Sequence, residues 1–400
     1  MTIKNLIFLS YKREDLNDLT YVHNVLRANG IRIWSDLEYL PPGSNTTREI
    51  QKAIFDKCVG FLIYVTPQSL KSDFIWNVEI PAAYEKSKRE NGNFLLIPII
   101  KGHDLIEPFR QKSLSKLGCD LTNRNGFVFE SGLVDISTIN DLAARLIEHL
   151  IRTTEYTPIE MFTYKPIPTC PPDHLVLDWS NFFSDTHPTK EEWRDVLTPS
   201  LKNIRRALLR KNKPQRDVWL PTRIHLSAAL AYGWIFRETR GFNLIASDKL
   251  KQENPEDIVD VNQFAKMRFD LVQGSRRARN LFLGISIAKD VHSSIERTKQ
   301  QGYRYRAGLF GTIENLGRNS ILNTTHAKFL AERTVEQLVA MRTKFQTSRT
   351  DLFISSSVQY AAYLGWYLNA CGHFTYWQYR NKTGDAIPSC DLDSLWDGDT

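Results

Sequence analysis

Cysteine is scarce in this chain of 400 residues, and its five cysteines are widely spaced. They include no CxxC pair, and an odd number of cysteines cannot all pair with one another. Both facts argue against a disulfide framework and against a cysteine-based zinc site. We therefore expect no metal site and a reducing compartment, the cytoplasm. The five are Cys58, Cys119, Cys170, Cys371 and Cys390.

Long apolar runs are also missing. The sequence contains no stretch of about 18 apolar residues, the length a helix needs to span a bilayer. The most apolar short stretch, residues 94–100, is interrupted by Pro98 and suits a buried strand. The first residues lead straight into a predicted strand, without the features of a signal peptide. We expect a soluble protein that has no membrane partner.

Basic residues outnumber acidic ones only in the later part of the chain. Residues 1–150 hold 18 Lys+Arg and 18 Asp+Glu, so the net charge of +7 arises wholly from residues 151–400. A basic region suits a polyanionic ligand or nucleic acid, and dispersed surface charge explains it equally well. Because no RNP, KH or helix-turn-helix signature occurs, we expect no direct binding of DNA or RNA.

The first third of the chain alternates apolar strands with helices. Hydrophobic residues make up 42% of the chain and charged residues 24%, as in folded proteins, and 400 residues exceed one ordinary core. Segments with helical spacing separate four predicted strands, which indicates βαβ units and a flavodoxin-like parallel sheet. The strands are residues 5–11, 31–34, 59–65 and 94–100.

Reactive side chains gather where these predicted strands end. Ligands of parallel sheets bind at the carboxyl ends of the strands. Those ends are residues 10–13, residues 34–36 and residues 66–73, and the last segment leads into a helix that carries Glu79. Glu79 is the one acidic residue on the first turn of that helix, which makes it the candidate catalytic carboxylate. The alternative is an ordinary surface charge.

Prolines mark the boundary between two parts of the chain. After Pro158, four more prolines fall within residues 166–172, and proline at this density forms a stiff extended segment. We therefore predict a first domain over residues 1–150, a linker over residues 151–172 and a second domain over residues 173–400. The four are Pro166, Pro168, Pro171 and Pro172.

The second part contains an internal repeat. Residues 223–236 resemble residues 352–367, because each has a short apolar strand, a serine-bearing turn and a small-residue helix with Ala-Tyr and Gly-Trp. Two such halves facing each other would form a pseudo-symmetric pocket at helix N-termini, where phosphates bind readily. Chance similarity between two small-residue helices is the alternative.

Candidate ligand groups lie at the ends of these repeated strands. Ser355, Ser356, Ser357 and their counterpart Ser227 precede or begin helices, where they either meet a phosphate or act as ordinary N-caps. The aromatic residues that either stack on bases or belong to the core are Tyr376, Trp377 and Tyr379. The cluster Arg276–Arg279 is either a phosphate contact or a solvated loop.

The first 135 residues resemble a TIR domain, and the order of their motifs carries the resemblance. One departure concerns Trp76, which lies three residues before Glu79, whereas many TIR NADases have tryptophan four residues before the catalytic glutamate. The role of Trp76 is therefore open, and that of Glu79 is not affected. The matching segments are Phe8-Leu-Ser-Tyr11, Lys12–Asp15, Gly30-Ile31, Asp36, Leu40-Pro-Pro-Gly43, Val59–Val65, Ser69, Ser72 and Glu79.

Residues 165–395 resemble a SAVED domain, a cyclic-oligonucleotide sensor built from two fused CARF-like, Rossmann-like halves. The helix Ser227-Ala-Ala-Leu-Ala-Tyr-Gly233 and its repeat carry this resemblance. The whole chain is similar to the TIR–SAVED effectors of bacterial CBASS anti-phage defence. The resemblance implies binding of a cyclic oligoadenylate such as cyclic tri-adenylate, assembly into a homo-oligomer or filament, and destruction of NAD⁺.

One carboxylate is enough for this chemistry. Cleavage of the nicotinamide–ribose bond passes through an oxocarbenium-like state, and nicotinamide leaves as a neutral molecule without a general acid. Glu79 would bind the ribose hydroxyls and stabilise the growing positive charge, with NAD⁺ as substrate and no cofactor. Tyr11, Trp34 or Trp76 would stack on a ring of NAD⁺, or the tryptophans belong to the core. Lys12 and Arg13 would hold the pyrophosphate, and Asp36 would meet ligand or cap a turn.

A non-enzymatic scaffold is the main alternative. Many TIR domains only assemble with other TIR domains, and the proline-stiffened loop of residues 36–45 suits that purpose equally well. Release of nicotinamide from NAD⁺ distinguishes the two functions.

Overall fold

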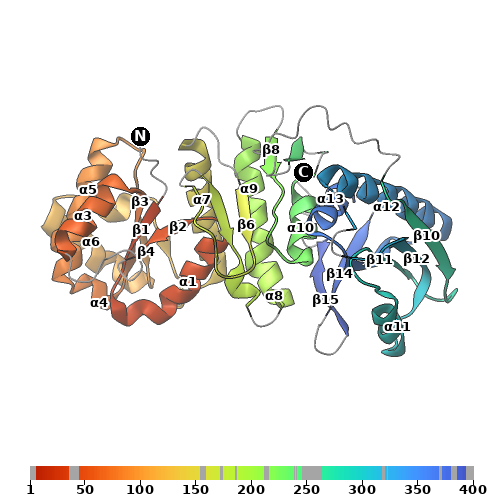
Figure 1. Ribbon diagram of the computed structural model, residues 1–400. Helices are drawn as coiled ribbons and strands as arrows, with labels where there is room; N and C mark the ends of the chain where they lie inside the picture. The colour runs from red at the N-terminus through yellow and green to blue at the C-terminus, as the bar shows by residue number, and fades with distance from the viewer. Residues whose placement is uncertain are drawn as a thin grey trace, which may run out of the picture. The chain divides into compact units, whose positions relative to one another are not determined.

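The computed structural model describes most of the chain, and its residues fall into two compact units (Figure 1). The N-terminal unit takes in Met1–Ile159, Pro168–Asp178 and Arg206–Lys211, and the C-terminal unit takes in the remainder. Asp36 and most of the loop of residues 36–45 lie outside the described residues. The described residues are 6–35, 45–153, 159–171, 174–184, 187–210, 216–237, 239, 241–245, 264–317, 320–321, 323–368, 372–379 and 385–392.

The N-terminal unit is built on a parallel sheet with the strand order β2-β1-β3-β4-β5. This order is that of flavodoxin-like folds, and it confirms the predicted fold class. The fifth strand was not predicted, because it has only two residues. The strands are β1 (Leu6–Ser10), β2 (Arg32–Trp34), β3 (Cys58–Val65), β4 (Leu95–Ile100) and β5 (Phe127–Val128).

Helices cover both faces of this sheet, with α1 and α7 on one side and α3, α5 and α6 on the other (Figure 1). Such cover explains why β3 is apolar along nearly its whole length. The core on the second side centres on Phe8, Phe61 and Trp34, all of them buried. The helices are α1 (Leu16–Ala28), α3 (Thr46–Asp56), α4 (Pro67–Leu70), α5 (Ile80–Arg89), α6 (Ile106–Leu117) and α7 (Ile136–Thr153).

A π-helical turn, Ile75–Glu79, precedes α5 and ends at the candidate carboxylate. A π turn holds more residues than an α-helical turn, so spacing rules drawn from α-helices do not apply across it. The capping box of Thr66 and Ser69 starts α4 just before it. The indole of Trp76 donates to Ser69 O at 3.2 Å, which ties the π turn to α4.

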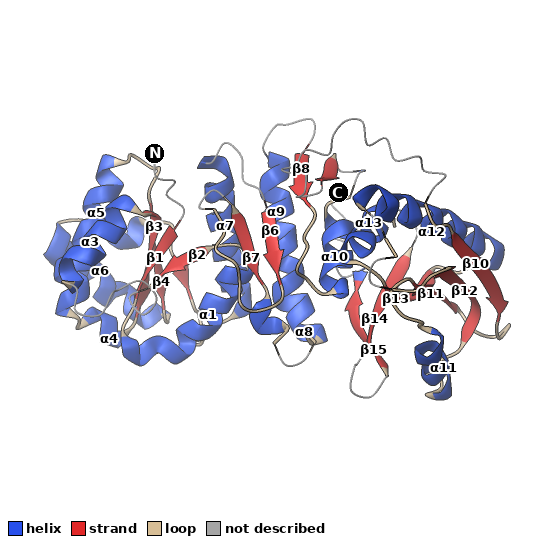
Figure 2. Cartoon of the chain, in the orientation of Figure 1, coloured by secondary structure: helices blue, strands red, loops and turns tan. Residues whose placement is uncertain are grey.

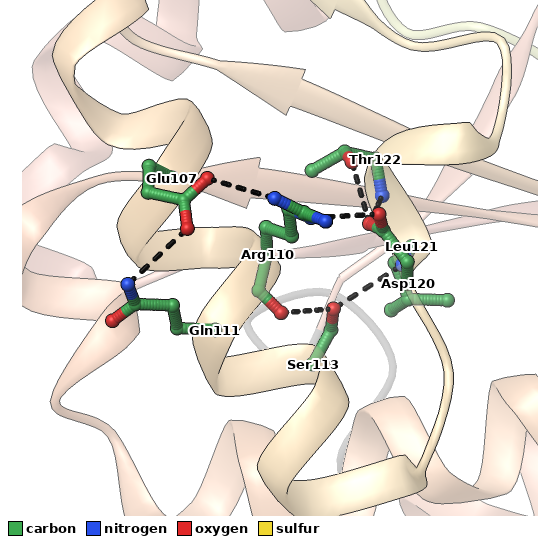
Figure 3. A network of polar contacts seen from close by, with 7 residues as sticks. All are labelled: Glu107, Arg110, Gln111, Ser113, Asp120, Leu121 and Thr122. Carbon is green, nitrogen blue, oxygen red and sulfur yellow. Dashed lines mark hydrogen bonds and ion pairs between the residues drawn. The ribbon is translucent and has the colours of Figure 1, made fainter.

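A polar network joins α6 to the turn that follows it (Figure 3). Arg110 lies between Glu107 and Asp120, and its Nε donates to Asp120 Oδ2 at 3.1 Å. Ser113 Oγ accepts from Leu121 N at 3.2 Å, so the turn after α6 is fixed to the helix by a second contact. This turn leads into β5, one of the two edge strands of the sheet.

A buried lysine of α5 binds the carbonyl groups at the C-terminal end of α3. The ammonium of Lys86, on α5, donates to the carbonyl oxygens of Ile54 at 2.8 Å, Phe55 at 2.8 Å and Cys58 at 2.6 Å. The last carbonyls of a helix have no partner within it, and a cation at that end also interacts favourably with the helix dipole. Lys86 therefore joins α3, α5 and the start of β3.

The C-terminal unit contains a six-stranded sheet with the order β10-β12-β11-β13-β14-β15. Its four central strands are parallel, and the two edge strands pair antiparallel with their neighbours. Helices α12 and α13 lie on one side of the sheet and α11 on the other (Figure 2). The strands are β10 (Met267–Gln273), β11 (Asn280–Ser286), β12 (Tyr305–Ile313), β13 (Arg349–Ser355), β14 (His373–Tyr379) and β15 (Ala386–Asp391).

The first half of the repeat in this unit has a parallel strand pair, β8 and β9, and helix α10. The strand expected just before α10 is instead β8, several residues earlier. The other elements that lie wholly or partly in this unit are β6 (Ile159–Phe162), β8 (Arg216–Trp219), β9 (Phe242–Ile245), α8 (Lys190–Glu192), α9 (Thr198–Arg210), α10 (Leu226–Ile235), α11 (His292–Gln300), α12 (Thr324–Phe345) and α13 (Val358–Tyr367). Of the helices described, none has both the length and the apolar character needed to cross a membrane.

The repeated helices α10 and α13 cross at two glycines. A Cβ on Gly233 would overlap Ala362 O and lie 2.9 Å from Trp366 N, and a Cβ on Gly365 would overlap Leu230 O and lie 2.9 Å from Trp234 N. When Gly233 is aligned with Gly365, Leu230 aligns with Ala362 and Trp234 aligns with Trp366, so the two sets of contacts are equivalent. The internal repeat is therefore present as a pseudo-symmetric pair of helices.

Part of the predicted linker belongs to the N-terminal unit. Arg32 Nη2 donates to Pro171 O at 2.9 Å and to His174 O at 3.3 Å. Strand β7 (Leu175–Asp178) follows, and the side chain of Leu175 lies against Gly30. The segment Glu160–Ile167, just before it in the chain, belongs to the C-terminal unit.

Substitution of Gly233 by alanine is expected to destabilise the C-terminal unit. The added methyl group would overlap backbone atoms of α13, and overpacking of this kind costs about 1–3 kcal/mol or more. Urea unfolding of the full chain measures the change. Gly317→Ala is the matched control, because a Cβ there meets only Ser320 Oγ at 3.6 Å. Equal stability of the two variants would contradict the close crossing.

Candidate functional site

Glu79 lies at the carboxyl edge of the N-terminal sheet. Its side chain is 8% exposed, and its Oε2 accepts a hydrogen bond from Ser10 Oγ at 2.5 Å. Ser10 is the last residue of β1, so this bond orients the carboxylate toward the strand ends. A buried carboxylate fixed at this edge can meet the positive charge of a reacting ligand.

The predicted neighbours Tyr11, Lys12 and Arg13 follow Ser10 directly. Tyr11 and Lys12 are half-buried and Arg13 is exposed, in the turn that leads to α1. Ser10 thus brings the end of β1 and Glu79 together. The sequence showed Ser10 only as a polar residue at a strand end, and no spacing motif identified it as the partner of Glu79.

The tryptophans proposed to stack on a ligand lie in the core instead. Trp34 is buried, and its ring stacks on Phe8 with centroids 4.6 Å apart. Trp76 is buried against Phe109 at 5.8 Å. Both positions agree with the core interpretation of these residues. Asp36 lies outside the described residues.

A pair of acidic residues, Asp15 and Asp18, lies near the ends of β3 and β4. Asp15 is buried, and its Oδ2 accepts from Thr66 Oγ1 at 2.8 Å. Burial raises the pKa of this carboxyl, and the hydrogen bond from Thr66 opposes the shift. Asp18 accepts from the hydroxyl of Tyr64 at 3.2 Å and pairs with Lys101. No sequence pattern identified this pair.

The C-terminal unit contains a cavity of about 800 Å³. The N-terminal ends of α10, α11 and α13 contribute to its walls, together with the end of β14. Its lining residues are Tyr164, His187, Thr222, Arg223, Ile224, His225, Leu226, Ala288, Lys289, Asp290, Val291, Ser294, Phe353, Ile354, Ser355, Ser356, Ser357, Val358, Tyr376, Trp377, Gln378, Tyr379 and Ala386.

Most predicted sensor residues line this cavity. Ser355, Ser356 and Ser357 lie between β13 and α13, and Ser357 Oγ accepts from Tyr360 N at 3.2 Å as an N-cap. Tyr376 and Trp377 form part of the wall from β14, as does Tyr379. Trp377 also packs on Phe353, with ring centroids 5.4 Å apart. Its ring therefore belongs to both the wall and the core.

Ser227 and the arginine cluster are placed elsewhere. Ser227 is the second residue of α10, is fully buried, and is not among the residues that line the cavity. The residue of the first half that corresponds to Ser357 is His225, the N-cap of α10. The Arg276–Arg279 loop precedes β11, at the opposite end of that strand from Lys289.

Sequence reasoning missed several groups of the wall. Arg223 and Lys289 provide positive charge, Asp290 provides negative charge, and Tyr164 and His225 provide rings. Tyr164 stands far from the repeat in sequence, so no local pattern connects it to His225. In the part of the chain that the structure describes, no group of His, Cys, Asp or Glu residues is arranged to hold a metal ion.

Two family models match the chain. Residues 7–127 match the TIR domain, and residues 201–392 match the SMODS-associated and fused to various effectors sensor domain, SAVED. No curated protein matches the sequence.

Solved structures that match this chain include two Cap4 SAVED/CARF-domain containing receptors. The receptor of Acinetobacter baumannii with the cyclic trinucleotide 3'3'3'-cAAA has 16% identity and a TM-score of 0.46, over 88% of this chain and 86% of that one. The receptor of Moraxella osloensis has 16% identity and a TM-score of 0.43 over the same shares.

The stability of the protein is expected to fall as the pH rises from about 4 to about 6, through Asp351 on β13. Burial raises the pKa of this carboxyl to about 6, against about 3.9 in an unfolded chain. The folded protein therefore holds a proton that the unfolded chain loses, which lowers the free energy of unfolding by at most about 3 kcal/mol across that range.

Asp351→Asn should remove this dependence, because an amide does not titrate. Its oxygen can still accept the hydrogen bond of the Tyr305 hydroxyl, which lies 3.0 Å from Oδ2 in the wild type. The free energy of unfolding of the variant, relative to that of the wild type, should rise from pH 4 to pH 6 and stay constant above pH 6. Urea unfolding at a series of pH values provides the comparison, and parallel profiles for the two proteins would refute the raised pKa.

Proposed function

We propose that this chain, which carries a TIR domain at its N-terminus and a SAVED domain at its C-terminus, is an NAD⁺ glycohydrolase switched on by a cyclic oligoadenylate. The two family matches confirm the resemblance drawn from the sequence. They support a TIR effector that is regulated by a cyclic oligonucleotide. Its proposed setting is the bacterial cytoplasm during phage infection, where it would deplete NAD⁺.

The observation that carries the enzymatic proposal is the position of Glu79. Its buried carboxylate lies at the carboxyl edge of a parallel sheet and is oriented by Ser10. The nicotinamide–ribose bond breaks through an oxocarbenium-like state, which a fixed carboxylate stabilises. Nicotinamide departs as a neutral molecule, so the reaction needs no second acid.

The turn after Ser10 supplies the proposed contacts to the rest of NAD⁺. Lys12 and Arg13 are the groups proposed to hold the pyrophosphate, and Tyr11 is proposed to stack on a ring. Trp34 and Trp76 are better suited to a supporting role, since both are buried in the core. Trp76 would then act on Glu79 through the π turn that they share.

The cavity of the C-terminal unit is the proposed site of the activator. Its size, its aromatic walls and its helix N-termini suit a ligand with several bases and phosphates. Arg223 and Lys289 add positive charge to the same walls. Cyclic tri-adenylate is the ligand proposed, and Ser355 and Ser356 are among the groups proposed to meet its phosphates.

Activation is proposed to proceed by oligomerisation. A separate sensor is useful only if the enzyme is inactive without ligand, so the ligand must change the state of the TIR domain. TIR–SAVED effectors stack into filaments, and we propose that a neighbouring copy completes the active site in the same way.

Substitution of Glu79 by glutamine is expected to slow nicotinamide release strongly. The charge that stabilises the oxocarbenium-like state is lost, and removal of one such group lowers rates by about 10²–10³-fold. The assay measures free nicotinamide after incubation with NAD⁺ and cyclic tri-adenylate. Glu85→Gln on the same helix is the control, because Glu85 is exposed and pairs with Arg89.

Two results decide between enzyme and scaffold. Nicotinamide release by the wild type and by Glu85→Gln, but not by Glu79→Gln, supports the enzyme. No release above the level of Glu79→Gln, with ligand-dependent assembly intact, means that the protein is a non-enzymatic TIR scaffold.

Ligand binding, assembly and activity are expected to appear together. Light scattering should show a larger particle once cyclic tri-adenylate is added, and nicotinamide release should rise over the same ligand concentrations. A panel of cyclic oligonucleotides, with mass spectrometry of the retained nucleotide, identifies the ring size and the bases. Full activity in a strictly monomeric, ligand-free sample would contradict the proposed gating.

A further inference from the structure

The imidazole of His225 is held in one orientation within the wall of the cavity. Tyr164 stacks on it at 4.2 Å between centroids with 19° between planes, and Phe183 does so at 4.6 Å and 20°. These two nearly parallel contacts enclose the ring. His187 meets it edge-on at 5.8 Å. The position of the ring is therefore fixed before any ligand binds.

The hydroxyl of Thr163 determines which ring nitrogen carries the proton. Thr163 Oγ1 accepts a hydrogen bond from His225 N at 2.8 Å and also lies 2.8 Å from His225 Nδ1. A hydroxyl has one proton to donate and two lone pairs, so Oγ1 could accept from both groups. Its own proton would then have no acceptor among the described residues, although Thr163 is only 1% exposed, and a buried donor takes a partner. Thr163 therefore donates to Nδ1, which makes Nδ1 an acceptor and leaves the proton on Nε2.

The same surroundings keep the ring neutral. Burial lowers the pKa of His225 to about 4, and the nearby His187 adds to the shift. Among the residues described, Nε2 has no hydrogen-bond partner. Since Nδ1 faces Thr163 and both ring faces are covered, Nε2–H is the polar group that His225 offers to the cavity.

We infer that His225 reads a nucleobase of the activator by donating its Nε2–H to a ring nitrogen of adenine. The inference rests on the proposed function and names a specificity-determining residue for that site. A neutral donor suits a neutral acceptor, whereas phosphate is better served by Arg223 and Lys289 in the same walls. Tyr164, 46% exposed beside the imidazole, offers a surface on which another base of the ligand stacks.

The cavity wall differs between the two halves of the repeat at this point. Ser357 corresponds to His225, and its hydroxyl is used to cap α13 by accepting from Tyr360 N. His225 makes no side-chain cap to α10. The first half therefore presents a base-reading group where the second half presents a helix cap, and the pseudo-symmetric cavity reads its ligand unequally.

The tautomer of His225 is measurable without ligand by nitrogen-15 NMR of histidine-labelled protein at pH 7. The signal that disappears in His225→Phe assigns the residue. We expect the neutral Nε2–H form in the wild type and in Thr163→Ser, which keeps the hydroxyl. Thr163→Val should shift the population toward Nδ1–H. A charged ring or the Nδ1–H form in the wild type would overturn the inference.

Calorimetry with cyclic tri-adenylate tests the contact itself. His225→Phe keeps the aromatic stack and removes the donor, so we expect affinity to fall about tenfold or more. His373→Phe, at an exposed histidine outside the cavity, should bind like the wild type.

Ligands with 1-deaza-, 3-deaza- or 7-deaza-adenine then locate the acceptor. The analogue that lacks the acceptor nitrogen should bind the wild type about tenfold more weakly than cyclic tri-adenylate does. His225→Phe should bind that analogue and cyclic tri-adenylate with the same affinity. If the losses multiply for all three analogues, His225 does not read the base. A wild type that binds no cyclic oligoadenylate would remove the proposed function and the inference together, whereas equal binding by His225→Phe would remove the inference alone.

Discussion

The C-terminal unit depends on the direct contact between the backbones of α10 and α13. Gly233 and Gly365 allow this approach, because any side chain at either position would overlap the opposite helix. The crossing fixes where both helices begin, and those beginnings supply His225, Leu226, Ser357 and Val358 to the walls of the cavity. The width of the ligand site is therefore determined by backbone contact, which is much less adjustable than side-chain packing.

The N-terminal unit places its carboxylate by a different route. The π turn that ends at Glu79 is held from one side by the bond of Trp76 to Ser69 and from the other by the bond of Ser10 to Glu79. Trp76 is a core residue, and it still influences the site, because it and Glu79 lie on the same turn. Trp76 and Glu79, whose spacing in the sequence is unusual, both lie within the π turn of Ile75–Glu79.

Much of the fold was predictable, because the rhythm of apolar segments reports burial directly. The parallel sheet and the repeated helices followed from such patterns, as did the position of Glu79 after a strand end. Ser10, Thr163 and Tyr164 were not predictable as partners, since each meets its contact across a long stretch of chain. Ser227 was assigned to the ligand from its place in the repeat, but the helix turns its side chain into the interior. β5 is too short for any periodicity.

The segment around the prolines limits how one unit of this chain could be exchanged for another domain. Along the chain, Glu160–Ile167 belongs to the C-terminal unit and the later Pro168–Asp178 belongs to the N-terminal unit, so the two units are interleaved in sequence. A single crossover anywhere in this stretch would deprive one unit of residues that it uses. It would remove Thr163 and Tyr164 from the ligand cavity, or Leu175 from its contact with Gly30. Replacement of one unit by another domain therefore requires more than one join.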